Sequence, residues 1–147
     1  MKIYYLSEKF YEVFKECKEI LTKEKRSYAV TLHTIDGIIF AIPIRSHVTH
    51  KYKLPTPNPD PKKKSGLDFS KAVPILSQEY IGSQATITEE EFKYLKKNKN
   101  LIYSNMKKYL NHYKKAVNKK DIPTNKLLCN CSALQYFHKE LKIKNIP

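Results

Sequence analysis

The chain has 147 residues, which fits one domain over 1–147, and folding at that size buries roughly two thirds of the surface of the unfolded chain. A composition that is 41% hydrophobic and 29% charged excludes an intrinsically disordered chain. Lysine and arginine number 28 against 14 acids, giving a formal net charge of +14 that attracts polyanions, most commonly nucleic acid. Because no segment is typical of a signal peptide or a membrane span, we expect a cytoplasmic protein without a membrane partner.

The first half of the chain is typical of a small β-sheet with one helix. Residues 2–6 predict a strand, and Ser7 then predicts the N-cap of a helix. The expected apolar face of this helix is Phe10, Val13, Phe14, Cys17, Ile20 and Leu21. Asp36-Gly37 lies between two β-branched runs and is a strong turn signal, so 28–35 and 38–44 are predicted to pair as a hairpin.

A proline-rich segment follows the hairpin. Residues 53–66 contain four prolines and predict neither helix nor strand, and a loop this long is usually functional or mobile. A strand over 71–75 and a helical turn over 77–80 come next.

The second half is predicted to be helical and basic. Thr88 with Glu91 fits a capping box. Apolar residues then recur at helical spacing as far as Val117, in one long helix or in two that meet at 98–100. Tyr109 and Tyr113 fall on this core stripe, whereas eleven lysines and a single acid lie between 93 and 126. Ser132 predicts the cap of a last helix over 133–141, which completes an α+β fold.

Residues 42–53, IPIRSHVTHKYK, concentrate groups suited to phosphate chemistry. RNA cleavage without a metal needs a base for the 2′-hydroxyl, an acid for the leaving oxygen and cations for the phosphate. His47 and His50 suit the first two roles, since histidine exchanges protons near neutrality. Arg45 is suited to gripping phosphate oxygens, Ser46 to donating a hydrogen bond, and Lys53 to adding charge.

Three other interpretations of the same residues remain open. The loop is equally typical of a solvated basic surface, and a non-catalytic protein that binds RNA or DNA would carry the same charge. A metal-dependent hydrolase is disfavoured because the segment has few acids. Cys17, Cys129 and Cys131 do not have the spacing of a zinc site, so we expect no metal and no cofactor.

Further candidate residues lie outside this segment. Asp68 is predicted to orient a histidine or to cap a turn, and Lys71 to contact phosphate or to lie at the surface. His33 is predicted to be structural, and His112 and His138 to be helical surface residues. We expect RNA contacts from Tyr28, Lys51, Tyr52, Lys62, Lys63, Lys64, Lys107, Lys108, Lys114 and Lys115, as phosphate-binding cations or base-stacking rings.

The order of these features resembles one protein family. The hairpin YAVTLHTIDGIIFAIPIRS, the basic proline-rich loop, the segment GLDFSKAVPI and the lysine-rich helix resemble the type III toxin–antitoxin endoribonucleases, the ToxN and AbiQ group, most closely the CptN and TenpN branches. The resemblance runs over nearly the whole chain. Ser46 matches the family's serine at the end of the second hairpin strand. Arg45 stands where ToxN-like members often have threonine.

The resemblance implies a fold and an activity. The fold is a bent antiparallel sheet flanked by helices, related to the MazF and Kid toxins. The activity is metal-independent, sequence-selective cleavage of single-stranded RNA, including cellular or phage mRNA, to 2′,3′-cyclic phosphate and 5′-hydroxyl ends. The implied partner is a repetitive antitoxin RNA pseudoknot, which the toxin excises and which closes with it into a ring-like assembly without a lasting protein partner. The family's basic residues after the serine correspond here to His47, His50, Lys51 and Lys53.

Overall fold

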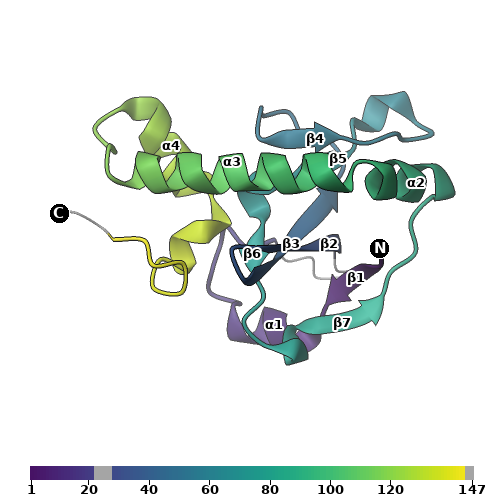
Figure 1. Cartoon of the computed structure of the whole chain (residues 1–147), viewed down its shortest axis with the longest axis horizontal. Helices are drawn as coiled ribbons and strands as arrows, with labels where there is room; N and C mark the ends of the chain where they lie inside the picture. Colours follow the sequence, from purple (N-terminus) through teal and green to yellow (C-terminus); the bar gives the residue numbers. More distant parts are fainter. Residues whose placement is uncertain (22–27, 145–147) are drawn as a thin grey trace.

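The computed structural model describes residues 1–21 and 28–144 as one antiparallel sheet with four α-helices (Figure 1). Its elements in chain order are β1 (Ile3–Leu6), α1 (Glu8–Val13), β2 (Ala29–Ile35), β3 (Ile38–Arg45), β4 (Lys53–Pro55), β5 (Gly66–Asp68), β6 (Val73–Pro74), β7 (Ile81–Gln84), α2 (Glu89–Lys97), α3 (Lys99–Val117) and α4 (Pro123–Cys131). The strands are ordered β4-β5-β3-β2-β1-β7, and β6 also pairs with β3. The α+β class and the antiparallel sheet are as predicted.

The central hairpin of the sheet forms at the predicted turn. Asp36 and Gly37 both have positive φ, 52° and 81°, which is the backbone of a tight turn whose twist matches that of its strands. Ile35 pairs with Ile38, and the register continues to Val30 opposite Pro43. The inward residues Ile35, Phe40 and Ile42 are fully buried.

Strand β3 changes partner along one edge, and this change places the candidate site. Its early residues Phe40 and Ala41 pair with β6, whereas Ile44 and Arg45 pair with Leu67 and Gly66 of β5. The end of β3 therefore lies beside β5. Arg45, the last residue of β3, comes next to the strand that ends in Asp68.

The prediction that residues 53–66 form neither helix nor strand is wrong at both ends of the segment. Strands β4 and β5 pair there, with Lys53 opposite Asp68 and Pro55 opposite Gly66. Pro55 is tolerated because β4 is an edge strand, where its missing N–H costs no ladder hydrogen bond. Gly66 is required because a Cβ there would lie 2.9 Å from the carbonyl oxygen of Leu54.

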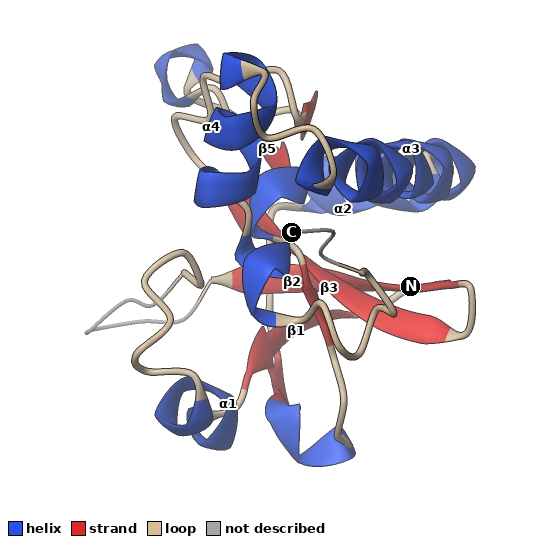
Figure 2. Ribbon diagram, turned by 90° about the vertical axis from the view of Figure 1, so that its left-hand side faces the viewer, coloured by secondary structure: helices blue, strands red, loops and turns tan. Residues whose placement is uncertain are grey.

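Helices α2 and α3 follow the predicted pattern. Thr88 caps α2 by accepting a hydrogen bond from the backbone N–H of Glu91, and α2 ends at Lys97 with Asn98 as its C-cap, at the expected break. The Glu91 carboxylate accepts a hydrogen bond from the Thr56 hydroxyl, which ties α2 to the segment after β4. The predicted stripe of α3 is buried, including Tyr109 and Tyr113. Figure 2 shows α2 and α3 on one side of the strands and α1 at the opposite end.

Several other elements differ from the prediction. Ser7 caps α1 as expected, but the helix ends at Val13, which is exposed, and the chain turns so that Phe14 packs against Phe10 and Phe137. Ser132 caps a 3-10 turn, Ala133–Tyr136, in place of a helix over 133–141. Another 3-10 turn, Phe69–Lys71, occupies the start of the expected strand 71–75 and leaves only the two residues of β6. Strand β7 and helix α4 were not predicted.

The described residues include no helix that is both long and apolar enough to span a membrane.

Candidate functional site

The buried carboxylate of Asp68 is the centre of the candidate site. One oxygen, Oδ2, lies 2.6 Å from Nη1 of Arg45, and the other, Oδ1, lies 3.0 Å from Nε2 of His50. The Asp68 side chain is 0% exposed, whereas those of Arg45 and His50 are 28% and 37% exposed. A buried carboxylate therefore holds two basic groups whose outer surfaces reach solvent, an arrangement that keeps the buried charge compensated.

Ser70 completes what we call the site cluster: Arg45, His50, Asp68 and Ser70. The Ser70 hydroxyl donates to Asp68 Oδ1 at 2.6 Å, and its backbone N–H donates to the same oxygen at 3.0 Å. The hydroxyl oxygen also lies 3.3 Å from His50 Nε2. The 3-10 turn that begins after Asp68 thus uses the carboxylate as its cap and brings a hydroxyl to the histidine.

The contacts of His50 identify its tautomer. The backbone N–H of Tyr52 donates to Nδ1 at 3.0 Å, so Nδ1 accepts and a neutral ring carries its hydrogen on Nε2, directed at Asp68. Both ring nitrogens of His50 therefore have partners within the protein. Arg45 and Asp68 cancel in charge.

Ser46 and His47 lie just outside the cluster, on the exposed turn that follows β3. His47 has a φ of 59°, and its backbone N–H donates to the carbonyl of Lys63 at 2.6 Å. This bond ties the turn to the proline-rich segment. Within the described part of the chain, the His47 ring makes no hydrogen bond or ion pair, whereas both ring nitrogens of His50 have partners.

The two lysines predicted to lie at the phosphate contact backbone carbonyls. Lys53 Nζ donates to the carbonyl of Val48 at 2.6 Å and so closes the turn 48–53. Lys71 Nζ donates to the carbonyl of Cys131 at 2.7 Å, at the negative end of α4. Lys71 and Tyr28 both line a narrow cavity of about 20 Å³, large enough for about one water molecule. The structure thus joins Arg45, His50 and Asp68 directly, and Lys71 contacts a different element.

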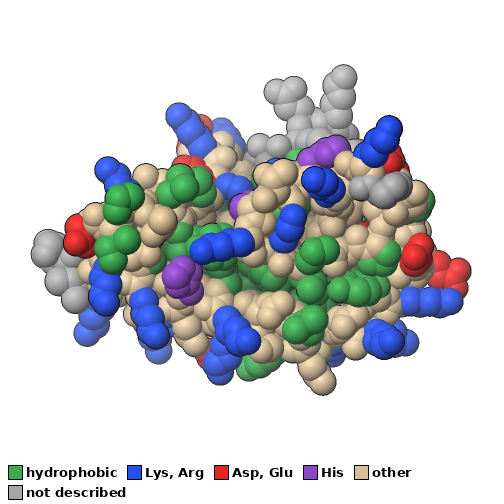
Figure 3. Space-filling view, turned by 90° about the horizontal axis from the view of Figure 1, so that it is seen from above, with side chains coloured by type: hydrophobic (Ala, Val, Ile, Leu, Met, Phe, Trp, Pro, Cys, Tyr) green, Lys and Arg blue, Asp and Glu red, His purple; other side chains and the backbone are tan. Residues whose placement is uncertain are grey.

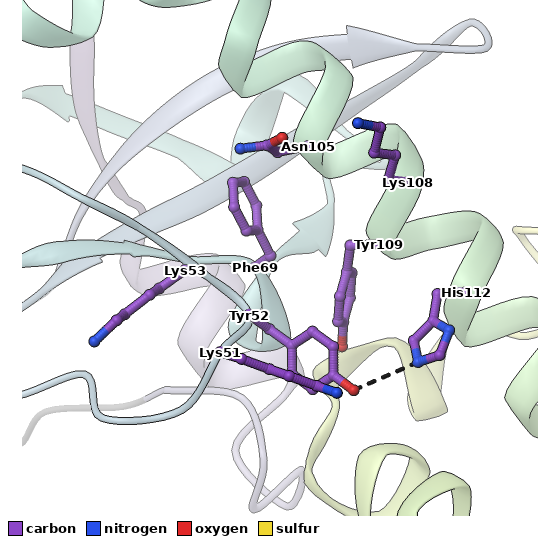
Figure 4. Close-up of a pocket in the computed structure, with 8 residues that line it drawn as sticks. All are labelled: Lys51, Tyr52, Lys53, Phe69, Asn105, Lys108, Tyr109 and His112. Carbon is purple, nitrogen blue, oxygen red and sulfur yellow. Dashed lines mark hydrogen bonds between the residues drawn. The ribbon is translucent and has the colours of Figure 1, made fainter.

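A larger cavity of about 310 Å³, which we call the α3 pocket, opens between the turn 51–53 and α3 (Figure 4). Its lining residues are Lys51, Tyr52, Lys53, Phe69, Asn105, Lys108, Tyr109 and His112. The rings of Tyr52 and His112 are nearly parallel, with centroids 5.9 Å apart, and Lys51 Nζ lies 5.3 Å from the centroid of the Tyr52 ring. His112 is exposed on α3, as predicted.

Basic side chains surround this region. Lys62, Lys63 and Lys64 are exposed on a 3-10 turn of the proline-rich segment, where Asp60 is the cap. On α3, Lys108 and Lys115 are exposed and Lys114 is partly so, while Lys107 lies 3.3 Å from Asp36. Figure 3, which looks down on the molecule from above the view of Figure 1, shows Lys and Arg side chains around a strip of apolar side chains.

The other histidines have structural positions. His33 is buried in β2, and burial, with a smaller effect of the Lys99 charge, lowers its pKa to about 4. His138 lies in a turn and not on a helical surface. Its Nε2 lies 2.6 Å from the Tyr113 hydroxyl, so the ring faces α3. Among the described residues, no three His, Cys, Asp or Glu side chains are grouped to hold a metal ion, and the cysteines there are free thiols.

Sequence reasoning missed three residues of this region. Ser70 follows Asp68 by two residues, a spacing at which an aspartate often accepts from the backbone N–H, and this pattern was a usable signal. Asn105 and His112 share one helical face with Lys108 and Tyr109, at intervals of three and four residues. No local signal shows that this face lies opposite Tyr52, because the contact depends on how α3 packs on the sheet.

Comparison with known proteins gives one informative result. No protein-family model matches the sequence, and no curated protein sequence matches it significantly. A solved structure does match, with a TM-score of 0.64 at 14% sequence identity, over 97% of this chain and 98% of the other. That structure belongs to a study of bacterial type III toxin–antitoxin systems and of selective toxin inhibition by a non-coding RNA pseudoknot. The chain thus has the fold of a protein from a type III toxin–antitoxin system, in agreement with the resemblance in its sequence.

Proposed function

We propose that this protein is the toxin of a type III toxin–antitoxin system and a metal-independent endoribonuclease whose active site is the site cluster with Ser46 and His47. The observation that carries the proposal is the buried Asp68 carboxylate holding Arg45 and His50 at the end of β3, next to an exposed serine and an exposed histidine. The shared fold and the +14 charge support an RNA substrate.

The proposed reaction is transesterification within the RNA. The 2′-oxygen attacks the adjacent phosphorus, the bond from phosphorus to the 5′-oxygen breaks, and a 2′,3′-cyclic phosphate and a 5′-hydroxyl result. One proton leaves the 2′-hydroxyl and one arrives at the 5′-oxygen, so the step balances without consuming water. A histidine that acts as such a base or acid typically raises the rate constant about 10²–10⁴-fold.

The contacts favour a division of labour between the histidines. His47, whose ring is exposed and makes no bond within the described residues, is suited to take the proton from the 2′-hydroxyl. His50 is the candidate acid for the leaving oxygen: Asp68 holds its Nε2, and Nδ1 takes up a proton when the hydrogen bond from the Tyr52 N–H opens. Arg45 is 28% exposed, and its guanidinium N–H groups beyond the Asp68 contact are available to the phosphate. Ser46 adds a donor, and Lys53 and Lys71 add charge around the site.

The proposed inhibitor is a repetitive antitoxin RNA that occupies the same surface. The structural neighbour comes from a study of a toxin inhibited by an RNA pseudoknot. Here the exposed Lys62, Lys63 and Lys64 and the lysines of α3 offer phosphate contacts beyond the cleavage centre. We infer that the antitoxin RNA binds across both groups of lysines and covers the site cluster, and that the proteins and RNAs close into one assembly.

The test is incubation of the purified protein, in excess EDTA, with single-stranded RNA transcribed from the DNA just upstream of its gene, where the proposed function places a repeat array. We expect discrete products with 2′,3′-cyclic phosphate ends, and a loss of about 10²–10⁴ in rate for His47→Ala and for His50→Ala. Asn111→Ala, at an exposed position of α3 outside the pocket lining, is the control and should retain wild-type cleavage. Full activity in both single variants would remove histidine catalysis from the mechanism.

A non-catalytic RNA-binding protein is the alternative, and one observation favours it. Both ring nitrogens of His50 and the ammonium groups of Lys53 and Lys71 already have partners within the protein. In that case the RNA would be bound with a strong salt dependence but recovered intact, and neutral replacement of His47 and His50 would leave its affinity unchanged.

A further inference from the structure

We propose that the α3 pocket is a subsite for one unpaired nucleobase of the bound RNA, read by Asn105, and that Tyr52 couples its occupation to His50. This inference rests on the proposed function for its ligand and extends it to the recognition of one base. It is carried by the chemistry of the lining and by two backbone hydrogen bonds that join the pocket to the site cluster.

The lining combines the three groups that a nucleotide requires. Aromatic rings form one part of it, with Tyr52, Phe69, Tyr109 and His112 all facing the cavity. Tyr52 packs edge-on against Tyr109 at 5.5 Å and is stacked with His112, so these three rings form one wall of the pocket (Figure 4). Such a wall offers a stacking surface to any base, because every base has a π-face.

The rim of the pocket is cationic. Lys51, Lys53 and Lys108 line the cavity, and its lining includes no acid. A phosphate on either side of a stacked base therefore meets only positive charge. This balance favours a nucleotide over a peptide or an apolar ligand, and the cavity of about 310 Å³ lies at the small end of the range for ligand sites.

Asn105 supplies the polar group that distinguishes one base from another. It is half-buried on α3, and among the described residues its amide makes no hydrogen bond, although the amide carries both a donor and an acceptor. An amide beside a stacked base is able to bond two atoms of the base edge, and such a pair discriminates strongly against the wrong base. Asn105 is therefore the specificity-determining residue of the subsite.

Two backbone hydrogen bonds connect the pocket wall to the proposed cleavage centre. The N–H of Tyr52 donates to His50 Nδ1 at 3.0 Å, and the carbonyl of Tyr52 accepts from the N–H of Phe69 at 3.0 Å. Phe69 lies between Asp68 and Ser70, the two residues that contact the other ring nitrogen of His50, Nε2. A base that packs on Tyr52 and Phe69 therefore contacts a residue whose backbone N–H is hydrogen-bonded to the His50 imidazole. We infer that the correct base fixes the position of His50.

The first experiment reads base preference at every position around the cut. Single-stranded RNA with a randomised window is cleaved in EDTA, and the products of wild type, Asn105→Ala and Asn111→Ala are sequenced. Asn111 is the matched control, an exposed asparagine of α3 outside the pocket lining. At a single RNA position, we expect Asn105→Ala to lower the ratio of cleavage with the preferred base to cleavage with the other bases about tenfold. Base preference at the other positions, and at every position in Asn111→Ala, should equal that of wild type. An unchanged profile in Asn105→Ala would overturn the inference while leaving cleavage established.

The second experiment does not depend on cleavage. The fluorescent base 2-aminopurine is placed at each position of an RNA that carries 2′-O-methyl groups and so lacks the attacking hydroxyl. We expect strong quenching at one position, and about tenfold weaker binding of that RNA to Tyr52→Leu than to wild type or Asn111→Ala. If wild type cuts no RNA, position-specific quenching that Tyr52→Leu abolishes still supports the subsite. Uniform quenching along the strand would overturn it.

The coupling to His50 is tested by the rate at saturating RNA. A wrong base at the position read by Asn105 is expected to lower the single-turnover rate constant about tenfold in wild type, beyond its effect on affinity. In Asn105→Ala the two bases should react at equal rates. A wrong base that weakens affinity alone would overturn the coupling.

Discussion

Helix α3 faces two polar regions within little more than one turn, and the regions differ in how far they open to solvent. Tyr113 and Tyr109 face what we call the C-terminal network, where the Tyr113 hydroxyl meets His138 Nε2 at 2.6 Å and the Tyr109 hydroxyl donates to Ser132 at 2.7 Å. His112 faces the α3 pocket, where its Nε2 lies 3.4 Å from the Tyr52 hydroxyl. The same pair of residue types, tyrosine and histidine, is thus used once in the core and once at the surface.

The difference between the regions lies in burial and not in chemistry. Tyr113 and Ser132 are 0% exposed, and burial raises the pKa of Tyr113, so this network only holds α3 to the C-terminal segment. The site cluster, which is joined to the α3 pocket through Tyr52, also has a buried centre, the Asp68 carboxylate. Unlike the C-terminal network, it has two side chains, Arg45 and His50, that extend to solvent. A buried anchor with an open outer surface holds charge in a fixed position for a ligand. A closed network contributes to stability alone.

The largest effect is expected when the buried anchor is removed. Asp68→Asn keeps the shape of the side chain but leaves Arg45 beside an uncharged amide, and removing one partner of a buried ion pair costs about 3 kcal/mol of unfolding free energy. Cleavage should fall as well, because an amide oxygen can still accept from His50 but the negative charge that holds Arg45 and His50 is gone. Urea denaturation at pH 7 measures the first effect.

Asp60→Asn is the matched control for Asp68→Asn. Asp60 is an exposed cap of the 3-10 turn in the proline-rich segment, and its replacement by the amide should cost less than about 1 kcal/mol. Equal and small losses in the two variants would mean that Asp68 is not a structural anchor.

The second prediction concerns His33, a buried histidine that belongs to neither region. Its Nε2 is buried without a hydrogen-bond partner in the described structure, and its pKa is lowered from 6.5 to about 4. Between these values the unfolded chain binds the extra proton and the folded chain does not. Stability is therefore fully present above pH 6.5 and is lost as the pH falls toward 4, by on the order of 3 kcal/mol.

His33→Phe tests this assignment, because it removes the titration while keeping a ring in β2. Thermal unfolding at several pH values between 7 and 4 should show a smaller decrease in Tm for His33→Phe than for wild type. Parallel curves would assign the acid sensitivity to other groups, of which the carboxylates with partners in the folded state are the first to consider.

How much of the molecule can be predicted depends on whether the information is local. The Asp36-Gly37 turn and the stripe of α3 are encoded within a few residues, and both were predicted. Strand β4 was not, because the cost of its proline depends on whether the strand lies at an edge, which is a property of the whole sheet, and β5 is the partner on which β4 pairs. The Arg45–Asp68 pair spans 23 residues and follows from the register of β3 on β5, so the sequence predicted the residues but not their contact.

The third prediction compares the two tyrosine–histidine pairs directly. Tyr113→Phe removes a part-buried hydrogen bond of 2.6 Å and should cost about 1 kcal/mol of unfolding free energy without changing RNA cleavage. Tyr52→Phe removes an exposed contact of 3.4 Å and should change stability by less than about 0.5 kcal/mol. Thermal unfolding and cleavage assays on both variants measure the difference. A larger loss of stability in Tyr52→Phe would contradict the division into a closed and an open region.

The smallest effect is expected at the basic surface beyond the pocket, and salt dependence is its most sensitive measure. Replacing Lys114 and Lys115 by glutamine should lower the slope of log affinity for single-stranded RNA against log salt by about 0.7 for each phosphate that the protein no longer neutralises. Lys15→Gln with Lys18→Gln removes the same charge just after α1, at the opposite end of the molecule from α3 (Figure 1). If RNA follows the α3 face, only the first pair changes the slope, because counterion release requires direct contact and not merely net charge. Equal changes would mean that the whole field of the protein, and not this face, holds the RNA.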